Sequence, residues 1–452
     1  MNVIIIGCGR VGRTLAQKLN DDGNVVTVID QSPEKIKRIT ERCDVLGVVG
    51  NGATQSAQQE AGVENADLLI AVTNSDELNM LCCLIAKKAS DCSTVARVKN
   101  PDYSQDTAYF KNELGLAMII NPEYAAAQEI ARVLRFPSAI KIDPFAKGKV
   151  ELVQFKLPTG SELVGMSVKD VAAKYACDVL ICTVEREDEA YITGGDFVFE
   201  EKDIVSIIGT PKNAYDFFVK TKVKENTIKN ALIVGGGTIT HYLCSILERS
   251  NINLKIIEKD LKRCEELSVR WDKVTVIHGD ANDHELLLEE GVEKTGALVS
   301  LSDVDEENIL LSVFAKGAGC NKLVTKVNRM DYDNVLSQLE LDTKICPRNI
   351  TADIILRYVR ATENASGSSS MQRLYNVIDD KVEAAEFVIK ENAPFIGKPL
   401  SKLKLKKNVL IASITRGDEV IVPRGNDTIE VGDTVIVVAK KKALVDITDA
   451  LR

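Results

Sequence analysis

The sequence has no apolar run long enough to cross a membrane and no surplus of positive charge. Its hydrophobic stretches fall short of the roughly 18 uncharged residues that a membrane-spanning helix needs, so we expect a soluble chain. The formal net charge is −9, whereas nucleic-acid binding requires a basic face, so we expect no nucleic-acid partner. The first residues, MNVIIIG, lack the basic region and cleavage site of a secretory signal, which favours a cytoplasmic protein.

Cysteine is present, but its pattern is not that of a metal site. The chain has 11 cysteines, and most of them, such as Cys82 and Cys83, lie inside apolar segments. Their spacing matches neither metal-ligand motifs nor the framework of a secreted disulfide-rich domain. We therefore interpret them as reduced, small hydrophobic residues and expect no metal ligands among them.

The sequence is duplicated. The segment GCGRVG at position 7 matches GGGTIT at position 235, and the same shift carries Asp30 onto Glu258 and Ala53 onto Ala281. After one added residue, EAGVENADLLIAVTNSDELN matches EEGVEKTGALVSLSDVDEEN, and VARVKNPDY matches VTKVNRMDY. A repeat of this length fixes the architecture before any motif is considered.

Each copy alternates short β-branched runs with helical patterns. The runs NVIIIG, VVTVID and DLLIAVT alternate with segments such as GRTLAQKLNDDG and DELNMLCCLIAKKA. This order is typical of a parallel sheet covered by helices. We therefore predict an α/β fold with two tandem Rossmann-type, doubly wound parallel-sheet domains, each followed by a small α+β C-terminal lobe.

The C-terminal lobes are rich in short alternating strands, which sets the domain boundaries. We place the first Rossmann-type domain at residues 1–135 and its C-terminal lobe at 136–222, the second Rossmann-type domain at 228–360 and its lobe at 371–452. The boundaries fall in DPFAKGKVE, KVKENTIKN and ENASGSSSMQ, and the last of these is the best candidate for a flexible linker.

The first glycine motif predicts a dinucleotide site. It follows a strand and opens a helix, so Gly7 permits the tight turn, Gly9 lets the backbone approach a pyrophosphate and Gly12 lets the helix pack on the strand. The N-terminus of that helix offers free N–H groups and a positive dipole end to the phosphates. The alternative is a glycine-rich turn that merely joins strand to helix.

Asp30 ends the second strand of the first copy. A carboxylate there accepts hydrogen bonds from ribose hydroxyls, and its negative charge repels a 2′-phosphate, which favours NAD over NADP. Asp30 is alternatively a helix-capping acid, although Ser32 before Pro33 is the better cap.

Thr73 and Asn74 follow the fourth strand, LLIAVTN, at the edge where open sheets bind their ligands. Their short polar side chains can bond ribose or phosphate, or they can cap the helix that begins at DELNM. We keep both interpretations open.

Two arginines of the first copy are candidate phosphate donors. Arg97 ends the fifth strand and Arg10 lies inside the glycine turn, where charge-assisted hydrogen bonds to phosphate are possible. For Arg97 we favour a ligand or interface role over a solvated charge. The second copy keeps a cation, Lys326, in place of Arg97 and has Thr238 in place of Arg10.

The second glycine motif is altered but keeps its essential parts. Gly235 and Gly237 keep the turn and the close approach, and Glu258 keeps the acid, whereas Thr240 replaces the glycine that eases helix-to-strand packing. We expect a usable site with weaker or different binding.

Catalytic groups for hydride transfer are missing. A dehydrogenase needs a proton donor or acceptor, commonly His or a Tyr with Lys four positions later. No tyrosine of this chain has that lysine, and the three histidines, His241, His278 and His284, lie in the second copy without a counterpart in the first. We therefore expect ligand binding without chemistry and no catalytic residues.

These motifs resemble the family of TrkA regulators of Trk-type potassium uptake, whose domains are called RCK or KTN. The resemblance covers essentially the whole chain. It rests on the duplication, on the two C-terminal lobes of the RCK-C or TrkA-C kind, and on IIIGCGRVG, VVGNGATQ, ADLLIAVTNSDELNM, ARVKNPDY and NPEYAAAQEIARVL.

The resemblance implies a cytoplasmic regulatory subunit, peripheral on the inner face of the cell membrane, that docks on an integral membrane potassium-translocating subunit of the Trk type. It implies a gating ring of eight Rossmann-type units, built by a homotetramer, and binding of NAD(H) and, in some members, ATP and ADP. The alternatives are a soluble NAD-dependent oxidoreductase and a structural scaffold with degenerate sites.

The resemblance also implies the nucleotide contacts. In the first copy they fall on Gly7, Cys8, Gly9, Arg10, Val11, Asp30, Thr73, Asn74 and Arg97, next to the packing glycine Gly12. In the second copy they fall on Gly235, Gly236, Gly237, Thr238, Ile239, Glu258 and Lys326.

Overall fold

The computed structural model of the chain describes residues 1–104, 106–223, 228–328, 332–341, 343–363, 369–378, 381–390, 395–440, 444 and 446–451. Parts of two predicted boundary segments, residues 224–227 and 364–368, lie outside the described residues. The chain divides into two compact units: Met1–Ala131 with Ile228–Leu356, and Arg132–Thr227 with Arg357–Arg452. Each unit therefore combines equivalent parts of the two sequence repeats.

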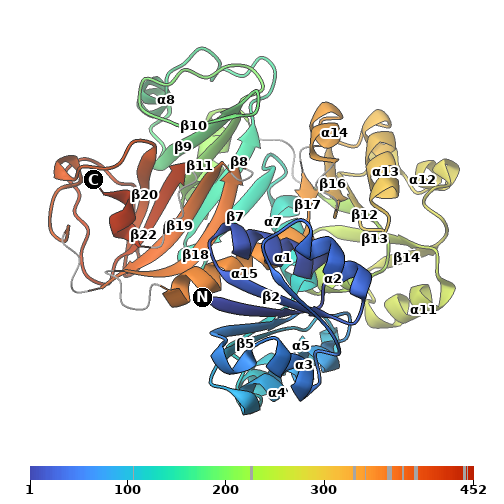
Figure 1. Cartoon of the computed structure of the whole chain (residues 1–452). Coiled ribbons are helices and arrows are strands. Elements are labelled where there is room, and N and C mark those ends of the chain that lie inside the picture. Colours follow the sequence, from blue (N-terminus) through green and yellow to red (C-terminus); the bar gives the residue numbers. More distant parts are fainter. Residues whose placement is uncertain are drawn as a thin grey trace. The chain divides into compact units, whose positions relative to one another are not determined.

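The first repeat forms a parallel sheet in the first unit, with strands and helices alternating along the chain (Figure 1). The strands are β1 (Asn2–Ile6), β2 (Val25–Asp30), β3 (Leu46–Val49), β4 (Leu68–Ala71), β5 (Ser93–Arg97) and β6 (Met118–Ile120). The helices are α1 (Arg10–Asp21), α2 (Pro33–Thr40), α3 (Gln55–Glu60), α4 (Asp76–Ala89), α5 (Pro101–Ser104), α6 (Thr107–Glu113) and α7 (Pro122–Arg135). Every residue of β4 is buried, as expected for a central strand covered on both faces.

The second repeat forms a sheet of the same kind. Its strands are β12 (Asn230–Val234), β13 (Asn253–Glu258), β14 (Thr275–His278), β15 (Ala297–Ser300), β16 (Lys322–Lys326) and β17 (Lys344–Ile345). Its helices are α10 (Thr238–Leu247), α11 (Leu261–Arg270), α12 (His284–Glu289), α13 (Asp305–Gly317), α14 (Asp333–Gln338) and α15 (Pro347–Glu363).

The two six-stranded sheets have the same strand order, β3-β2-β1-β4-β5-β6 and β14-β13-β12-β15-β16-β17. The pairing of β1 with both β2 and β4 is parallel, and so is that of β12 with β13 and β15. The strand order therefore reverses beside the first strand, which is the doubly wound arrangement. Ligands of such sheets bind beyond the carboxyl ends of the strands at this switch point.

The second unit contains two five-stranded antiparallel sheets, of order β10-β9-β11-β8-β7 and β18-β19-β22-β20-β21. The strands of the first are β7 (Lys141–Phe145), β8 (Val150–Lys156), β9 (Val179–Arg186), β10 (Glu189–Ile192) and β11 (Ile204–Gly209), with helices α8 (Val168–Tyr175) and α9 (Pro211–Lys220). The strands of the second are β18 (Ser369–Ile378), β19 (Val382–Ile389), β20 (Val409–Arg416), β21 (Glu419–Ile421) and β22 (Thr434–Lys440).

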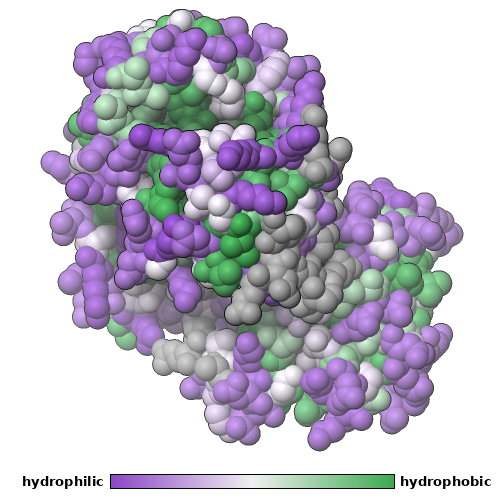
Figure 2. Space-filling view, turned by 90° about the vertical axis from the view of Figure 1, so that its left-hand side faces the viewer, coloured by the Kyte–Doolittle hydropathy of each residue, from purple (hydrophilic) through white to green (hydrophobic). Residues whose placement is uncertain are grey.

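The two antiparallel sheets share one core. Phe145 and Leu152 of the first sheet belong to the same buried cluster as Val382 and Ile436 of the second. The Gln154 amide donates a hydrogen bond of 3.0 Å to a backbone carbonyl of β18, so a buried polar contact also joins the two sheets. Figure 2 shows hydrophilic side chains over most of its visible face, with apolar residues in small patches between them.

The predicted fold class is confirmed: two Rossmann-type parallel sheets, each followed along the chain by a smaller lobe with an antiparallel sheet. No helix within the described residues is long and apolar enough to cross a membrane.

Candidate functional site

The first glycine turn is fixed by the carboxylate that ends β2. Gly7 has a φ of +104°, and a Cβ there would lie 3.1 Å from the backbone of Val72 and Thr73, so the position requires glycine. The backbone N–H of Cys8 donates a hydrogen bond of 2.7 Å to Asp30 Oδ2. This bond holds the turn against the end of the neighbouring strand.

Asp30 therefore has a structural function, while its predicted contact with ribose stays a prediction. Its second oxygen, Oδ1, accepts a hydrogen bond of 2.9 Å from the N–H of Ser32. The cap of α2 is Ser32, whose hydroxyl accepts from the N–H of Lys35. Each carboxylate oxygen has two lone pairs, so Asp30 keeps acceptor capacity for ribose hydroxyls while it holds the turn.

A cavity of about 380 Å³ lies at the carboxyl ends of the strands beside this turn. That volume lies within the usual range for small-molecule sites, about 300–1,000 Å³. Five predicted residues line it: Gly7, Gly9, Asp30, Thr73 and Asn74. The other predicted residues of the first copy, Cys8, Arg10, Val11, Gly12 and Arg97, are not among its lining residues, and their ligand roles stay predictions.

The helix beside the cavity presents free backbone donors. Gly9 is the N-cap of α1, and no side chain of the described residues caps that helix end. A Cβ on Gly9 would meet nothing within 4 Å, so the glycine leaves open space in front of the N–H groups. Uncapped N–H groups facing an open cavity are suited to bind phosphate.

Thr73 and Asn74 are not the cap of α4, because Ser75 performs that function by accepting from the N–H of Leu78. The N–H of Thr73 instead donates a hydrogen bond of 2.8 Å to the side chain of Asn79. Asn79 is fully buried and also donates to the carbonyl of Arg97, so it joins the ends of β4 and β5. The capping alternative therefore belongs to Ser75.

Arg97 makes an ion pair that the sequence did not suggest. Its Nη2 lies 2.6 Å from Glu123 Oε1 on α7, and both side chains are about 15 % exposed. The guanidinium is thus held by a carboxylate outside the cavity.

Sequence reasoning missed several lining residues of the first cavity. These are chiefly Gln31, Ser32, Lys35 and Asn51. Lys35 brings a cation, with its Nζ 3.6 Å from Asp30 Oδ1. Asn51 lies in VVGNGATQ, at the end of β3, and its position at a strand end was the signal that could have identified it.

The second copy repeats this construction with a longer acid. Gly235 has a φ of +97°, and the N–H of Gly236 donates a hydrogen bond of 2.5 Å to Glu258 Oε2. Glu258 Oε1 accepts from the N–H of Asp260 at 2.8 Å. A cavity of about 230 Å³ lies beside this turn. The predicted residues that line it are Gly235, Gly236, Gly237 and Glu258. The other predicted residues of this copy, Thr238, Ile239 and Lys326, do not line it.

Thr240 fits its position through a hydrogen bond. In the first copy, a Cβ on Gly12 would lie only 1.8 Å from the carbonyl oxygen of Gly7. In the second copy, Thr240 is fully buried, and its hydroxyl donates a hydrogen bond of 2.5 Å to the equivalent carbonyl, that of Gly235. The altered motif thus replaces a close glycine contact with a side-chain hydrogen bond.

The two cavities differ in charge. The first is lined by one acid, Asp30, and one lysine, Lys35. The second is lined by one lysine, Lys259, and by the acids Glu258, Asp280, Asp303 and Glu307.

Asp303 of the second cavity takes the position of Asn74 in the first. Its carboxylate lies 3.0 Å from Lys326 Nζ, so the cation that the second copy has in place of Arg97 is paired with an acid. Phosphate groups are therefore less favoured in the second cavity.

The described cysteines and acids form no metal site. No group of three or more His, Cys, Asp or Glu residues within the described chain is arranged to hold a metal ion. Burial raises the pKa of the Cys82 thiol to about 12, which keeps it protonated at neutral pH.

The contrast between Gly12 and Gly9 gives a test of the first turn. We predict that Gly12→Ala lowers the free energy of unfolding by about 1–3 kcal/mol, because the added methyl meets a backbone carbonyl. Gly9→Ala is the matched control, since its methyl meets nothing within 4 Å. Urea unfolding followed by circular dichroism measures both, and equal losses for the two variants would contradict the packing described for Gly12.

The fold defines a protein with two Rossmann-type domains, each with a cavity at its switch point and each followed by an antiparallel-sheet lobe. The TrkA-N domain family matches residues 3–122 and 231–347, and the TrkA-C domain family matches residues 152–219 and 384–452. The chain therefore belongs to the TrkA family, as its motifs indicated.

Relatives of known name resemble the chain over its whole length. It is 34 % identical over 453 residues to Trk system potassium uptake protein TrkA homolog 1 of Methanosarcina mazei, covering 98 % of each chain. It is 31 % identical over 451 residues to Trk system potassium uptake protein TrkA of Halomonas elongata, covering 99 % of this chain and 98 % of that one. These names describe potassium uptake proteins and not enzymes, which agrees with the expectation of a protein without catalytic residues.

Solved structures share the fold at low sequence identity. A structure described as the GsuK channel bound to NAD has a TM-score of 0.63 and 16 % identity, covering 99 % of this chain and 78 % of that chain. The GsuK RCK domain has a TM-score of 0.63 and 15 % identity, covering 99 % of this chain and 94 % of that chain.

Proposed function

We propose that the chain is a nucleotide-binding regulatory subunit that controls potassium uptake by a Trk-type membrane protein. The observation that carries the proposal is the pair of cavities at the switch points of the two parallel sheets, each beside a glycine turn held by an acid. Membership of the TrkA family and the names of the relatives support the connection to potassium uptake.

NAD(H) is the proposed ligand of the first cavity. The uncapped N-terminus of α1 suits the pyrophosphate, and Asp30 suits the ribose hydroxyls while repelling a 2′-phosphate. The structural relative described as bound to NAD supports this choice. None of the residues lining this cavity is His, Tyr or Cys, which favours binding without hydride-transfer chemistry.

The second cavity is proposed to bind a nucleotide more weakly or with a different preference, ATP or ADP being the candidates from the family. Its four acids oppose phosphate, whereas its glycine turn and its acid keep the same geometry as in the first. The two cavities would then report on different ligands within one chain.

A hydrogen-bonded path joins the two Rossmann-type domains. Tyr242 on α10 donates to the carbonyl of Lys99 at 3.0 Å and accepts from Asn121 at 2.8 Å. The N–H of Lys99 in turn donates to Asp76 at the start of α4, the helix beside the first cavity. Because α10 begins at the second glycine turn, a change at one cavity has a direct mechanical route to the other.

Regulation follows from linkage. A nucleotide shifts the protein between two shapes only by as much as its affinities for those shapes differ, and the same shift is passed to a bound partner. We propose that a homotetramer places eight Rossmann-type units in a gating ring on the cytoplasmic face of the potassium-translocating subunit, where this shift acts on the pore.

Titration calorimetry of NADH, NAD, ATP and ADP into the intact chain tests the binding proposal. We expect Asp30→Asn to weaken NAD(H) binding by about tenfold or more, because a charged ribose acceptor is lost. Glu258→Gln should weaken the ligand of the second cavity alone. Glu34→Gln, an exposed carboxylate on α2, is the control and should bind like the parent.

If Glu258→Gln leaves all binding intact while Asp30→Asn abolishes it, the second copy is a structural partner without a ligand. If neither substitution changes any affinity, the proposed sites are wrong.

Reciprocal charge changes test the predicted difference between the cavities. We expect Asp303→Asn to strengthen binding of ATP or ADP to the second cavity by roughly two- to fivefold, because it removes a negative charge and releases Lys326. Asn74→Asp should weaken nucleotide binding to the first cavity. Both effects should shrink at high salt, and the opposite sign for either variant would refute the electrostatic argument.

A further inference from the structure

The first unit has a third cavity, separate from the two described above. Its volume is about 370 Å³, and it shares no lining residue with either glycine-turn cavity. It lies between α10 and α11 of the second copy and the starts of α5 and α7 of the first. No residue predicted from the sequence as a ligand contact lines it.

The cavity has an aromatic wall. Trp271, the only tryptophan of the chain, is 8 % exposed, and its ring lies edge-on to that of His241 with centroids 5.3 Å apart. Tyr242 and Tyr124 continue the wall, with centroids 5.3 Å apart. The Trp271 Nε1 is buried and has no hydrogen-bond partner among the described residues, so the wall holds an unused donor. Such a wall suits a flat ring.

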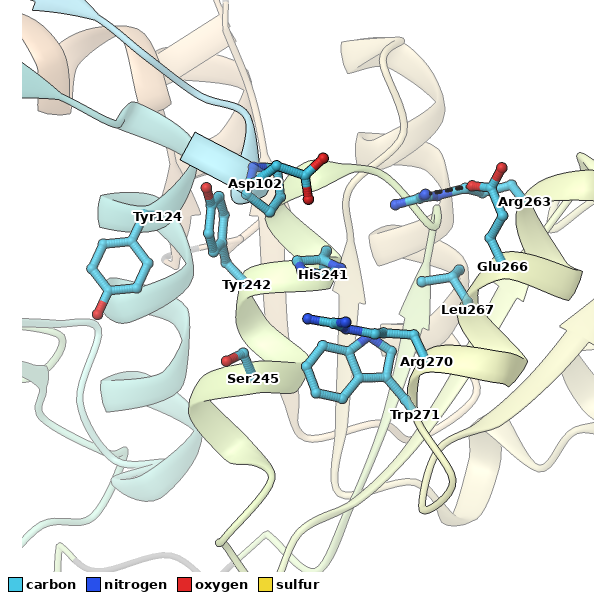
Figure 3. A pocket seen from close by; sticks show the side chains of 11 residues that line it. Asp102, Tyr124, His241, Tyr242, Ser245, Arg263, Glu266, Leu267, Arg270 and Trp271 are labelled. Atoms are coloured by element: carbon cyan, nitrogen blue, oxygen red, sulfur yellow. Dashed lines mark hydrogen bonds and ion pairs between the residues drawn. The ribbon is translucent and has the colours of Figure 1, made fainter. Parts of the chain in front are cut away.

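Two arginines extend into the same hollow, as Figure 3 shows. The Arg270 guanidinium lies over the Trp271 ring at 5.8 Å, and no described carboxylate is paired with it. Arg263 Nη1 is paired with Glu266 at 2.8 Å, and Asp102 lies at the edge of the hollow.

The cavity is lined by two arginines, Arg263 and Arg270, and by two acids, Asp102 and Glu266, and only Arg263 and Glu266 are paired with each other among the described residues. Burial lowers the pKa of His241, and the charges of Arg270 and Arg263 lower it further against the opposing charge of Asp102. At His241 the two arginines outweigh Asp102, and Arg270 has no paired carboxylate among the described residues, so this side of the cavity favours an anion.

We propose that this cavity is a third ligand site, which binds an organic anion of about the size of a nucleoside monophosphate. The flat ring of the ligand packs against the Trp271 wall, and its anionic group binds the Arg270 guanidinium and the free donors of Arg263. Arginine is the preferred partner for phosphate and carboxylate groups because its donors form a planar fork.

The position of Arg263 connects this site to the second glycine turn. Its Nε donates a hydrogen bond of 2.7 Å to the carbonyl of Gly236, the residue whose N–H is bound by Glu258. A ligand that draws the Arg263 side chain toward the third cavity therefore acts on the second one, and the coupling is reciprocal.

Intrinsic fluorescence of Trp271 tests the proposal in the full-length chain. The probe is adenosine monophosphate, titrated with NAD present in excess to occupy the first cavity. We expect saturable quenching or a spectral shift, with adenosine and inorganic phosphate each at least about tenfold weaker, because each supplies only half of the recognised chemistry.

Substitution of Arg270 tests whether the fluorescence response comes from the third cavity. Arg270→Ala should weaken the apparent affinity for adenosine monophosphate by about tenfold, whereas Lys262→Ala, an exposed cation on the same helix outside the cavity, should leave it unchanged. Arg270→Lys should retain part of the affinity.

Three results would overturn the proposal. One is an emission that does not respond to millimolar adenosine monophosphate. Another is a response that Arg270→Ala leaves intact, because the ligand would then act from elsewhere. The third is an emission that changes with protein concentration in the absence of ligand, which would show that a second copy of the chain covers the cavity instead.

Discussion

The carboxylate at the end of the second strand of each parallel sheet is the contact on which the candidate sites depend. Without it, the N–H at the middle of the glycine turn would lack a partner beside a cavity that must stay open to ligand. The bond from Cys8 to Asp30 measures 2.7 Å, and that from Gly236 to Glu258 measures 2.5 Å.

The two copies make this contact with different pairs of residues. A short acid, Asp30, faces a turn residue that carries a side chain, Cys8, whereas a longer acid, Glu258, faces Gly236. A Cβ on Gly236 would lie 2.6 Å from a methyl of Leu267 and 3.0 Å from Glu258 Oε2, so Leu267 and the longer acid both favour glycine there. The GGGTIT motif thus matches the side chains that pack around it.

The buried frame behind the cavities is the same in both copies, while the lining differs. Asn79 and Asn308 make equivalent bonds to the backbone at the end of the fourth strand and to the carbonyl of the fifth. Asn74 and Asp303 occupy equivalent places in front of this frame and differ in charge. A constant frame with a changed lining is what two sites for different ligands require.

Much of the fold followed from the sequence because the signals were local. The strand order follows from the alternation of strands and helices, and the positive φ of Gly7 and Gly235 follows from the glycine motif. The family resemblance was also carried by contiguous motifs and is confirmed by the domain matches. Periodicity and turn chemistry act between residues close in sequence, so they are readable without tertiary structure.

The features that sequence reasoning missed depend on residues far apart in the chain or on the exact geometry of a turn. The ion pair of Arg97 with Glu123 on α7 was not expected, and the phosphate contact of Arg97 stays a prediction. The hydrogen bond of Thr240 depends on the exact position of the Gly235 carbonyl in the second glycine turn. The third cavity is lined by both Tyr124 and Trp271, and neither of these two segments predicts it alone. These are consequences of packing, which local patterns do not encode.

Nucleotide control of potassium flux is the claim to which the cavities, the path through Tyr242 and the family all lead. The most direct measurement is potassium flux into vesicles that contain a Trk-type translocating subunit and this chain, with NADH, NAD, ATP and ADP added one at a time. We predict that at least one nucleotide changes the flux and that Asp30→Asn removes the response to NAD(H). A flux that none of the four nucleotides alters, with the chain bound to its partner, would contradict the proposal.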